Sequence, residues 1–476
     1  MKKNIIQICL LVAVFCSASC SDWFDVSPKA DVKIEDLFKS EAGFRDVLIG
    51  GYSLMSKPSM YGREMTWGFL DVLSLYYPSI NNKDHQYYKA MRHLYDEPEV
   101  QSVTDAVWVT GYKAISNLNA ILKHIDDKQD VFPDKAAYEL LKGETLALRA
   151  FLHFDLCRLF GPVPSPANNS QQSVPYMSDF TNVAQVPLSM TDMYSALMKD
   201  IDEALLLMRD HDLIGPEYAQ LYDGNSTKVS RRKKYLNYYS VALLKARIAH
   251  YFGDKTAAME GVKLILPTAQ SEIPEPLSLT EKADSKQRLF NSELLFMLDI
   301  VDFEDKLSPF CGDKAKESGI SGTTQLSFSR VAKEKLYEKS ASNYNYFRLQ
   351  TWFTDMDGRT DMMAKYQGAK TIPMLHLSEL YYIAAQCAAN NEEALTYLNK
   401  IRAHRGLAPV TEDQYETELE KEYLKEFMGE GEIFFYYKRK GSNRMGVFST
   451  KTVTDVSKHY QIPYPLAEME YGKITF

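Results

Sequence analysis

The chain is organised around KGETLALRAFLHFDLCRLFGPVP, residues Lys142–Pro164. Apolar residues recur in this stretch at helical spacing and spread beyond one stripe, which predicts a helix buried on more than one side. They are Ala147, Leu148, Phe151, Leu152, Phe154, Leu156, Leu159 and Phe160. The polar interruptions are Arg149, His153, Asp155 and Arg158. Gly161 followed by Pro162 predicts the helix end, with the glycine left-handed and the proline blocking continuation.

Helical spacing continues on both sides of this stretch. Further helices are expected at Glu35–Met55, from Thr104 to Asp126, at Thr191–Met208 and at Tyr235–Gly253. Near the C-terminus, the pattern predicts two helices, Leu375–Asn390 and Glu392–Arg402, joined at Asn390 and Asn391. This helix–turn–helix unit is close to the period of about 34 residues of tetratricopeptide repeats, whose helix pairs stack.

Composition limits the class of protein and the class of partner. The chain has 476 residues, of which 45% are hydrophobic and 25% charged, so it is long enough for a large core and is not disordered. Its net charge of −8 provides no basic surface overall, which argues against nucleic acid as the main partner. A neutral or weakly charged ligand is easier to accommodate.

The N-terminus is typical of a secretory signal. Lys2 and Lys3 precede the apolar run Ile5–Phe15, which is too short to span a bilayer. Small residues follow at positions 17–19 and lead to Cys20, which is placed like the acylated first residue of a bacterial lipoprotein. Lipoprotein signals usually carry Leu where this chain has Ser17. The alternative is an ordinary signal peptide with an incidental cysteine.

The sequence predicts no metal or cofactor site. Cys157, Cys311 and Cys387 are expected to be packing residues, because no CxxC or Cys/His cluster is present. Asp355, Asp357, Gly358 and Asp361 suggest calcium, but the glycine lies at the wrong offset for an EF-hand loop, so a solvated turn is expected. Signatures of hydrolases, metalloproteases, P-loop enzymes and dinucleotide-binding enzymes are also missing.

Three segments lack regular periodicity: Ser56–Gln101, Leu266–Tyr366 and the run from Pro164 to Val186, which is too polar to be core. The first two are rich in aromatic residues. Rings on loops can stack on the apolar faces of sugars, although they can equally fix a loop to its scaffold. The predicted ligand contacts are the rings of Trp67, Tyr76, Tyr77, Phe310, Tyr344 and Trp352, with Asn81, Asn82 and Arg348 as polar neighbours.

The order of several motifs resembles the SusD/RagB family of outer-membrane nutrient-binding lipoproteins. The resemblance covers nearly the whole chain. It rests on Tyr112–Leu122, Glu144–Pro164, the helix with Asp200, Ala204 and Leu205, Tyr238–Asp254, Ile372–Gln386, Ala394–Gly406, Glu422–Gly441 and Ile462–Met469. The chain departs from the family at His376, where Arg is common, and in the segment from Glu432 to Lys438, which is usually richer in Arg.

This resemblance implies a mostly α-helical, SusD-like fold, in which tetratricopeptide-like helix pairs form the scaffold and long irregular loops face the ligand. It implies a lipoprotein signal peptide at residues 1–19, an N-terminal SusD-like region at 20–270 and a C-terminal RagB/SusD region at 271–476. The implied role is capture of a glycan at the cell surface and its delivery to a SusC-like TonB-dependent transporter. Lipidation at Cys20 would hold the protein on the outer membrane, without a cofactor or a bound metal.

Three other functions remain open from the sequence. The protein could capture peptides, as some members of the family do, or serve as a structural partner of the transporter with no ligand of its own. A surface glycoside hydrolase is the third alternative, because glycosidase carboxylates leave no local signature. Peptides require backbone donors and acceptors along an edge, whereas glycans require aromatic platforms, so the ring-rich segments favour a glycan.

Overall fold

The computed structural model describes residues 34–77, 80–216, 226–280, 288–317, 322–338, 347–446 and 455–473. The fold is mostly helical, as predicted. The longer helices are α3 (Glu41–Met55), α5 (Pro98–Ile125), α6 (Lys135–Phe160), α7 (Met190–Met208), α10 (Tyr238–Phe252), α11 (Lys255–Lys263), α16 (Leu377–Cys387), α17 (Asn391–His404), α18 (Tyr415–Glu426) and α19 (Glu432–Lys440). Cys20 and Tyr344 lie outside the described residues.

Further helical elements connect these helices. They are α2 (Ile34–Leu37), α4 (Phe69–Leu73), α9 (Ser226–Arg232), α12 (Phe303–Cys311), α13 (Asp313–Glu317), α14 (Arg330–Leu336), α15 (Phe347–Thr351), α20 (Val456–Tyr460), α21 (Leu466–Tyr471) and the 3₁₀ turns η2 (Ala90–Arg92), η3 (Asp126–Val131), η4 (Pro166–Asn168) and η5 (Glu412–Gln414). Within the described ranges, none of the helices combines the length and the hydropathy that a membrane span requires.

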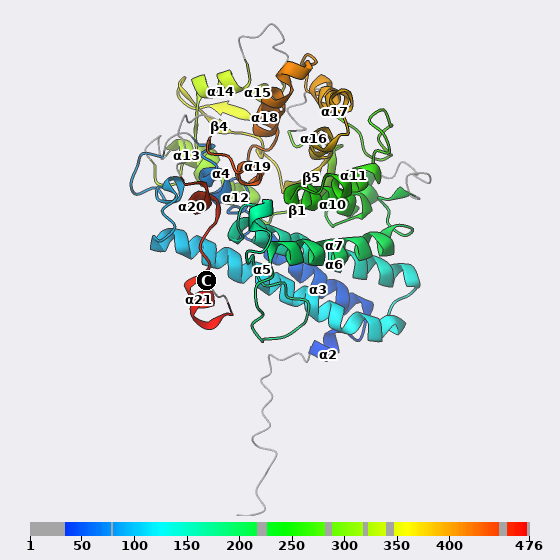
Figure 1. Ribbon diagram of the computed structural model, residues 1–476. Coiled ribbons are helices and arrows are strands. Elements are labelled where there is room, and N and C mark those ends of the chain that lie inside the picture. The colour runs from blue at the N-terminus through cyan, green and yellow to red at the C-terminus, as the bar shows by residue number, and fades with distance from the viewer. Residues whose placement is uncertain are drawn as a thin grey trace, which may run out of the picture.

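The scaffold is a stack of helix pairs. Helices α3 and α5, α6 and α7, α10 and α11, and α16 and α17 pack as pairs, and each pair contacts the next. Figure 1 shows these helices as layers, with α4, α12 to α15, α18 and α19 gathered at one end of the stack. The predicted C-terminal pair is confirmed, with Asn390 as the N-cap of α17. The side chain of Asn390 accepts a hydrogen bond from the N–H of Glu393 at 2.9 Å.

In the part of the chain that the structure describes, two small antiparallel sheets complete the fold. Strand β1 (Leu294–Asp299) pairs with β5 (Thr371–His376), in the register Met297 opposite Pro373 and Leu298 opposite Ile372. Strands β2 (Phe328–Ser329), β3 (Phe353–Asp355) and β4 (Thr360–Met363) form the second sheet in the order β2-β4-β3. The aspartates considered for calcium lie at the β3–β4 hairpin, where the Asp355 carboxylate accepts from the Gly358 N–H at 2.8 Å.

Helix α6 is the central element, and its buried charges all find partners. Arg149 forms a two-bond ion pair with Asp200, at 2.7 and 2.8 Å. Arg158 bonds both Asp155 and Glu432, the latter 274 positions further along the chain. Because a buried charge without a partner costs several kcal/mol, these pairs explain how polar residues can interrupt the apolar faces of this helix.

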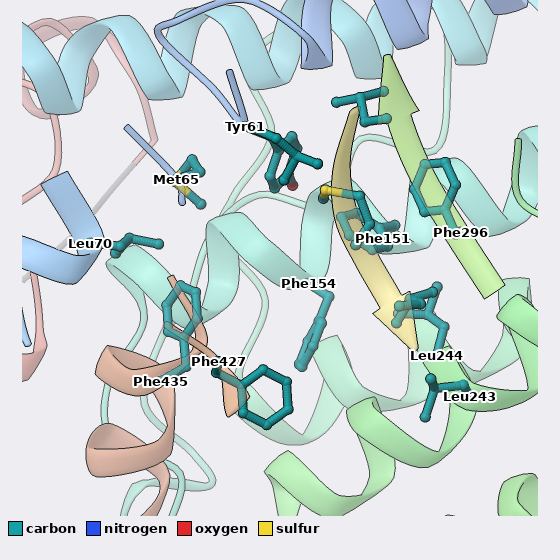
Figure 2. Close-up of a cluster of buried hydrophobic side chains, with 14 of the residues drawn as sticks. Tyr61, Met65, Leu70, Phe151, Phe154, Leu243, Leu244, Phe296, Phe427 and Phe435 are labelled. Carbon is teal, nitrogen blue, oxygen red and sulfur yellow. The ribbon is translucent and has the colours of Figure 1, made fainter. Parts of the chain in front are cut away.

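The apolar faces of α6 form the centre of the core. Figure 2 shows Phe151 and Phe154 of α6 in one cluster with Phe296 of β1, Leu244 of α10 and Phe435 of α19. The Phe151 and Phe296 rings meet edge to face, with centroids 6.2 Å apart. Elements from both halves of the sequence therefore share a single hydrophobic core.

Helix α6 ends at the predicted residue but by a different mechanism. The backbone of Gly161 is extended, with φ −73° and ψ 168°, so the prediction of a left-handed glycine is wrong. Glycine is needed there for space, because a Cβ atom would lie 2.7 Å from the carbonyl oxygen of Cys157. A left-handed glycine does end another helix, α10, where Gly253 has a φ of 85°.

Candidate functional site

The two aromatic-rich irregular segments lie side by side, as a shared site would require. The backbone N–H of Gln86 donates to the carbonyl of Thr323 at 3.0 Å. The His85 ring nitrogen Nε2 lies 3.0 Å from the carbonyl oxygen of Gln325. The Trp67 ring packs edge to face on Phe310, with centroids 5.2 Å apart. The segments are thus fixed to each other by buried contacts.

Four of the rings predicted to stack on a ligand are interior, and for these four the prediction is wrong. Trp67, Tyr76, Tyr77 and Phe310 are each at most 4% exposed. The Tyr76 hydroxyl donates to the carbonyl of Leu424 at 2.7 Å, and the Tyr77 hydroxyl donates to that of Trp67 at 2.8 Å. Irregular backbone offers no continuous apolar face, so large rings fill the space between these segments and the helices.

Trp352 and Arg348 are also structural. The Trp352 indole N–H donates to the carbonyl of Arg288 at 2.7 Å, and its ring is 1% exposed. Arg348 is completely buried and bonds Glu422 at 2.7 Å and Glu426 at 2.6 Å. The prediction of Arg348 as a ligand contact is therefore wrong as well, because its guanidinium compensates two buried carboxylates.

Asn81 and Asn82 remain available at the surface. Asn81 is exposed and Asn82 is half-buried, with its Oδ1 accepting from the Asp84 N–H at 3.0 Å. The half-buried Tyr88 ring belongs to the same segment and is covered by the Arg92 guanidinium at 3.5 Å from its centroid. The cavity lined by α12 and β4 at this end of the molecule holds only about 40 Å³, which is too small for a sugar ring.

A larger open groove lies between α5 and the segment 175–185, and its volume is about 390 Å³. This is within the range of small-molecule sites. Its apolar lining consists of Trp108, Val109, Tyr112, Ile115, Pro175, Met177, Val183 and Ala184. Its polar lining consists of Ser116, Asn119, Asp179, Thr181, Asn182, Gln185 and, from α21, Glu468. We call this the α5 groove.

Hydrogen bonds from α5 hold the far wall of the α5 groove. Asn119 donates through Nδ2 to the carbonyls of Met177 at 2.7 Å and Asp179 at 3.2 Å. The Tyr112 hydroxyl donates to the carbonyl of Pro175 at 2.8 Å. The wall is thus fixed before any ligand arrives, which lowers the entropic cost of binding.

A second row of side chains, from α6, supports this wall. His153 accepts the N–H of Met177 on Nε2 at 2.9 Å, and its Nδ1 lies 2.9 Å from the carbonyl of Arg149, to which it therefore donates. Burial, together with the nearby Arg149 charge, lowers the pKa of His153 to about 3. The imidazole is consequently neutral at physiological pH, which this pair of hydrogen bonds requires.

The exposed groups of the α5 groove suit a neutral polyhydroxyl ligand. Asn182 and Gln185 are exposed amides that can both donate to and accept from hydroxyl groups, and Asp179 adds an exposed carboxylate acceptor. Val109 and Val183, which are 63% and 54% exposed, provide an apolar rim. No group of three or more potential metal ligands is found in the described part of the chain.

None of the predicted contacts that the structure describes lines the α5 groove. One signal in the sequence pointed toward it: the polar run from Pro164 to Val186, interpreted as non-core, contains its far wall. The near wall of the groove belongs to α5, a helix that the sequence analysis assigned to the scaffold.

Sequence comparison matches both parts of the chain to known families. Residues 22–213 match a SusD-like family described as starch-binding and associating with the outer membrane, and residues 304–463 match the SusD family. The SusD-like protein P2 of Formosa agariphila is 20% identical over 444 residues, covering 84% of this chain and 81% of that protein. SusD-like protein P25 of the same organism is 27% identical over 167 residues, a match that spans 34% of this chain and about a third of the relative.

Solved structures share the fold. A SusD superfamily protein from Bacteroides thetaiotaomicron superposes with a TM-score of 0.69 at 18% identity, covering 91% of this chain and 98% of that one. A SusD-like carbohydrate-binding protein from Bacteroides vulgatus superposes with a TM-score of 0.63 at 17% identity, covering 84% of each chain.

Proposed function

This chain belongs to the SusD/RagB family, and on that premise we propose that it binds a glycan at the outer membrane and delivers it to a SusC-like TonB-dependent transporter. The glycan occupies the α5 groove. The observation that carries this assignment is the preformed groove of about 390 Å³ with exposed amides on an apolar base. The family description and the carbohydrate-binding neighbour support a sugar as the ligand.

Removing both exposed amides of the α5 groove is expected to weaken glycan binding about thirtyfold. Each net hydrogen bond contributes about 1 kcal/mol, and two correspond to about that factor in Kd. The measurement is titration calorimetry on the soluble form beginning at residue 21, comparing Asn182→Ala/Gln185→Ala with the unsubstituted protein on a ligand first identified on a glycan array. Both residues are exposed, so the fold should tolerate the change.

The matched control is Asn81→Ala/Asn82→Ala, which removes two surface amides from the segment first predicted to hold the ligand. If this pair lowers affinity and the groove pair does not, the site lies at the ring-rich segments instead. Binding of peptides without any oligosaccharide would favour the alternative of peptide capture. Shortening of the bound oligosaccharide during overnight incubation would establish a glycoside hydrolase, whereas we expect binding without turnover.

The anchor proposed at Cys20 gives a prediction of its own. Cys20→Ser removes the thiol that is acylated, and more than one acyl chain is needed for stable anchoring. The variant is expected to lose nearly all radiolabelled palmitate and to move from the outer-membrane fraction to the soluble fraction. Cys387→Ser changes a buried packing thiol and serves as the control that should keep its label. Unchanged labelling of the Cys20→Ser protein would contradict lipidation at this position.

A further inference from the structure

A second open cavity, of about 400 Å³, lies between α3, α6 and α9 and shares no lining residue with the α5 groove. Its lining is mainly apolar and includes Leu48, Ile49, Leu140, Leu141, Leu213 and the ring of Tyr235. The charged lining consists of four cationic side chains, Arg45, Lys228, Arg231 and Arg232, and one carboxyl group, that of Glu144. We call it the α3–α9 pocket.

The inner wall of the α3–α9 pocket is held by a buried network in which one guanidinium faces two carboxyl groups. The Arg232 guanidinium bonds the Asp212 carboxylate at 2.9 and 2.7 Å and the Glu144 carboxylate at 2.9 Å. Tyr52 donates its hydroxyl to Glu144 at 2.8 Å, and the side chains of Glu144 and Asp212 are at most 10% exposed. This wall therefore keeps its shape without a ligand, and the Arg232 guanidinium is already occupied by two carboxyl groups.

At the mouth of the pocket, the cation that a ligand can reach is Arg231. Arg45 pairs with Glu41 at 2.5 Å, one turn earlier on α3. Arg231 is exposed, and its guanidinium has no ion pair or hydrogen bond among the described residues. An anionic group at the mouth would meet Arg231 first, and charge-assisted bonds to guanidinium are among the strongest available to a carboxylate.

Apolar side chains beside these cations are exposed to water. Ile49 is 48% exposed and Leu213 is 38% exposed, in a concave setting that a small apolar body can fill. Covering such surface is favourable in proportion to the area removed from water. A neutral sugar would neither cover this apolar lining nor pair with the Arg231 guanidinium.

We propose that the α3–α9 pocket binds a small free amphipathic carboxylate, with its apolar chain against Ile49, Leu140 and Leu213 and its carboxylate at Arg231. The concave shape favours a single molecule over the flat surface of a bilayer. This site is separate from the glycan site in the α5 groove, so the protein carries two ligands of different chemistry.

Titration calorimetry on the soluble form tests this proposal with three probes: octanoate, which has both features, 1-octanol, which lacks the charge, and glucuronate, which lacks the apolar chain. We expect octanoate to bind with one-to-one stoichiometry, octanol at least tenfold more weakly, and glucuronate not at all. Equal binding of octanol and octanoate would overturn the role of Arg231, and no octanoate binding would overturn the site.

Two variants locate the site on the protein. Arg231→Ala should reduce octanoate affinity to that of octanol, and Ile49→Asp should abolish binding of both, while Lys458→Ala on the remote helix α20 should change neither. Both pocket residues are exposed, so circular dichroism should show folded variants. Sedimentation with phosphatidylglycerol vesicles, without octanoate binding, would assign the pocket to a lipid surface and overturn the proposal. Glycan affinity in these variants stays unchanged, which separates this test from that of the α5 groove.

Discussion

Replacing Arg405 by alanine is expected to lower the free energy of unfolding by about 3–5 kcal/mol. Arg405 is fully buried and bonds Glu293 at 2.8 and 2.7 Å and Glu426 at 3.1 and 2.6 Å. Removing the guanidinium leaves the buried carboxylates of Glu293 and Glu426 without enough positive charge beside them. The resulting loss of stability is larger than the net contribution of the ion pairs to the folded state. The measurement is urea unfolding of the soluble form at pH 7, followed by circular dichroism.

Acidic pH should reduce the difference in the free energy of unfolding between Arg405→Ala and the unsubstituted protein. Burial by itself raises the pKa of Glu426, but Arg405 and Arg348 outweigh it and hold that pKa well below its usual range. A carboxyl group whose pKa is lower in the folded state than in the unfolded state, where it is about 4.3, stabilises the fold at pH values above the unfolded-state pKa. This stabilisation is lost as the pH falls through the folded-state pKa. In Arg405→Ala the Glu426 carboxylate loses one of the two guanidinium groups that depress its pKa and protonates more readily. The free energy of unfolding of the variant should therefore lie closer to that of the unsubstituted protein at pH 4 than at pH 7.

The matched control is Lys458→Ala, which breaks a pair with Asp455 in which the lysine side chain is 81% exposed. Exposed pairs contribute at most about 1 kcal/mol, so little change in unfolding is expected. If Arg405→Ala proved as mild as this control, the buried network would not be a major source of stability.

The second large effect is expected from Phe151→Ala, at about 3–5 kcal/mol of unfolding free energy. The Phe151 side chain is 1% exposed and packs on the rings of Tyr61 and Phe296, with centroids 5.7 and 6.2 Å away. Truncation removes apolar burial and opens a cavity where α6 meets β1 (Figure 2). Thermal and urea unfolding measure the loss, and Phe151→Leu, which keeps more of the volume, should lose less.

Leu206→Ala provides the comparison on a helix surface. Leu206 of α7 is 75% exposed, so the same kind of truncation should change stability by less than about 0.5 kcal/mol. A loss in Phe151→Ala no greater than in Leu206→Ala would contradict the central position assigned to α6.

Helical spacing predicted the scaffold because burial on a helix imposes a repeating pattern. Leu148, Phe151 and Leu152 recur at that spacing and are buried in α6 as expected. The segment Leu294–Asp299 lies within a region that the sequence left without an assigned element, and it forms β1 by pairing with β5, more than 70 positions further along the chain. The division of the chain at residue 270 stays a prediction from the sequence.

The site was harder to predict, because irregular segments carry no periodicity that separates buried from exposed rings. In the sequence, Trp67 and Tyr76 cannot be distinguished from exposed rings that bind a ligand. They are buried because other parts of the fold cover them. The α5 groove depends on the pairing of α5 with a loop more than 50 residues later, through Asn119 and Met177. Such a contact follows from tertiary packing and leaves no local pattern.

The hydrogen bonds of Asp71 link parts of the chain that are synthesised far apart in time. Its carboxylate in α4 accepts the N–H groups of Gly429 at 2.8 Å and Gly431 at 3.1 Å, some 360 positions later in the sequence. Arg158 likewise pairs with a residue near the C-terminus, Glu432. During synthesis, the N-terminal segments leave the ribosome before their C-terminal partners have been made, so the native packing around Asp71 and Arg158 can form only once the last part of the chain is present. Contacts of such long sequence separation make folding slower than local helical contacts do.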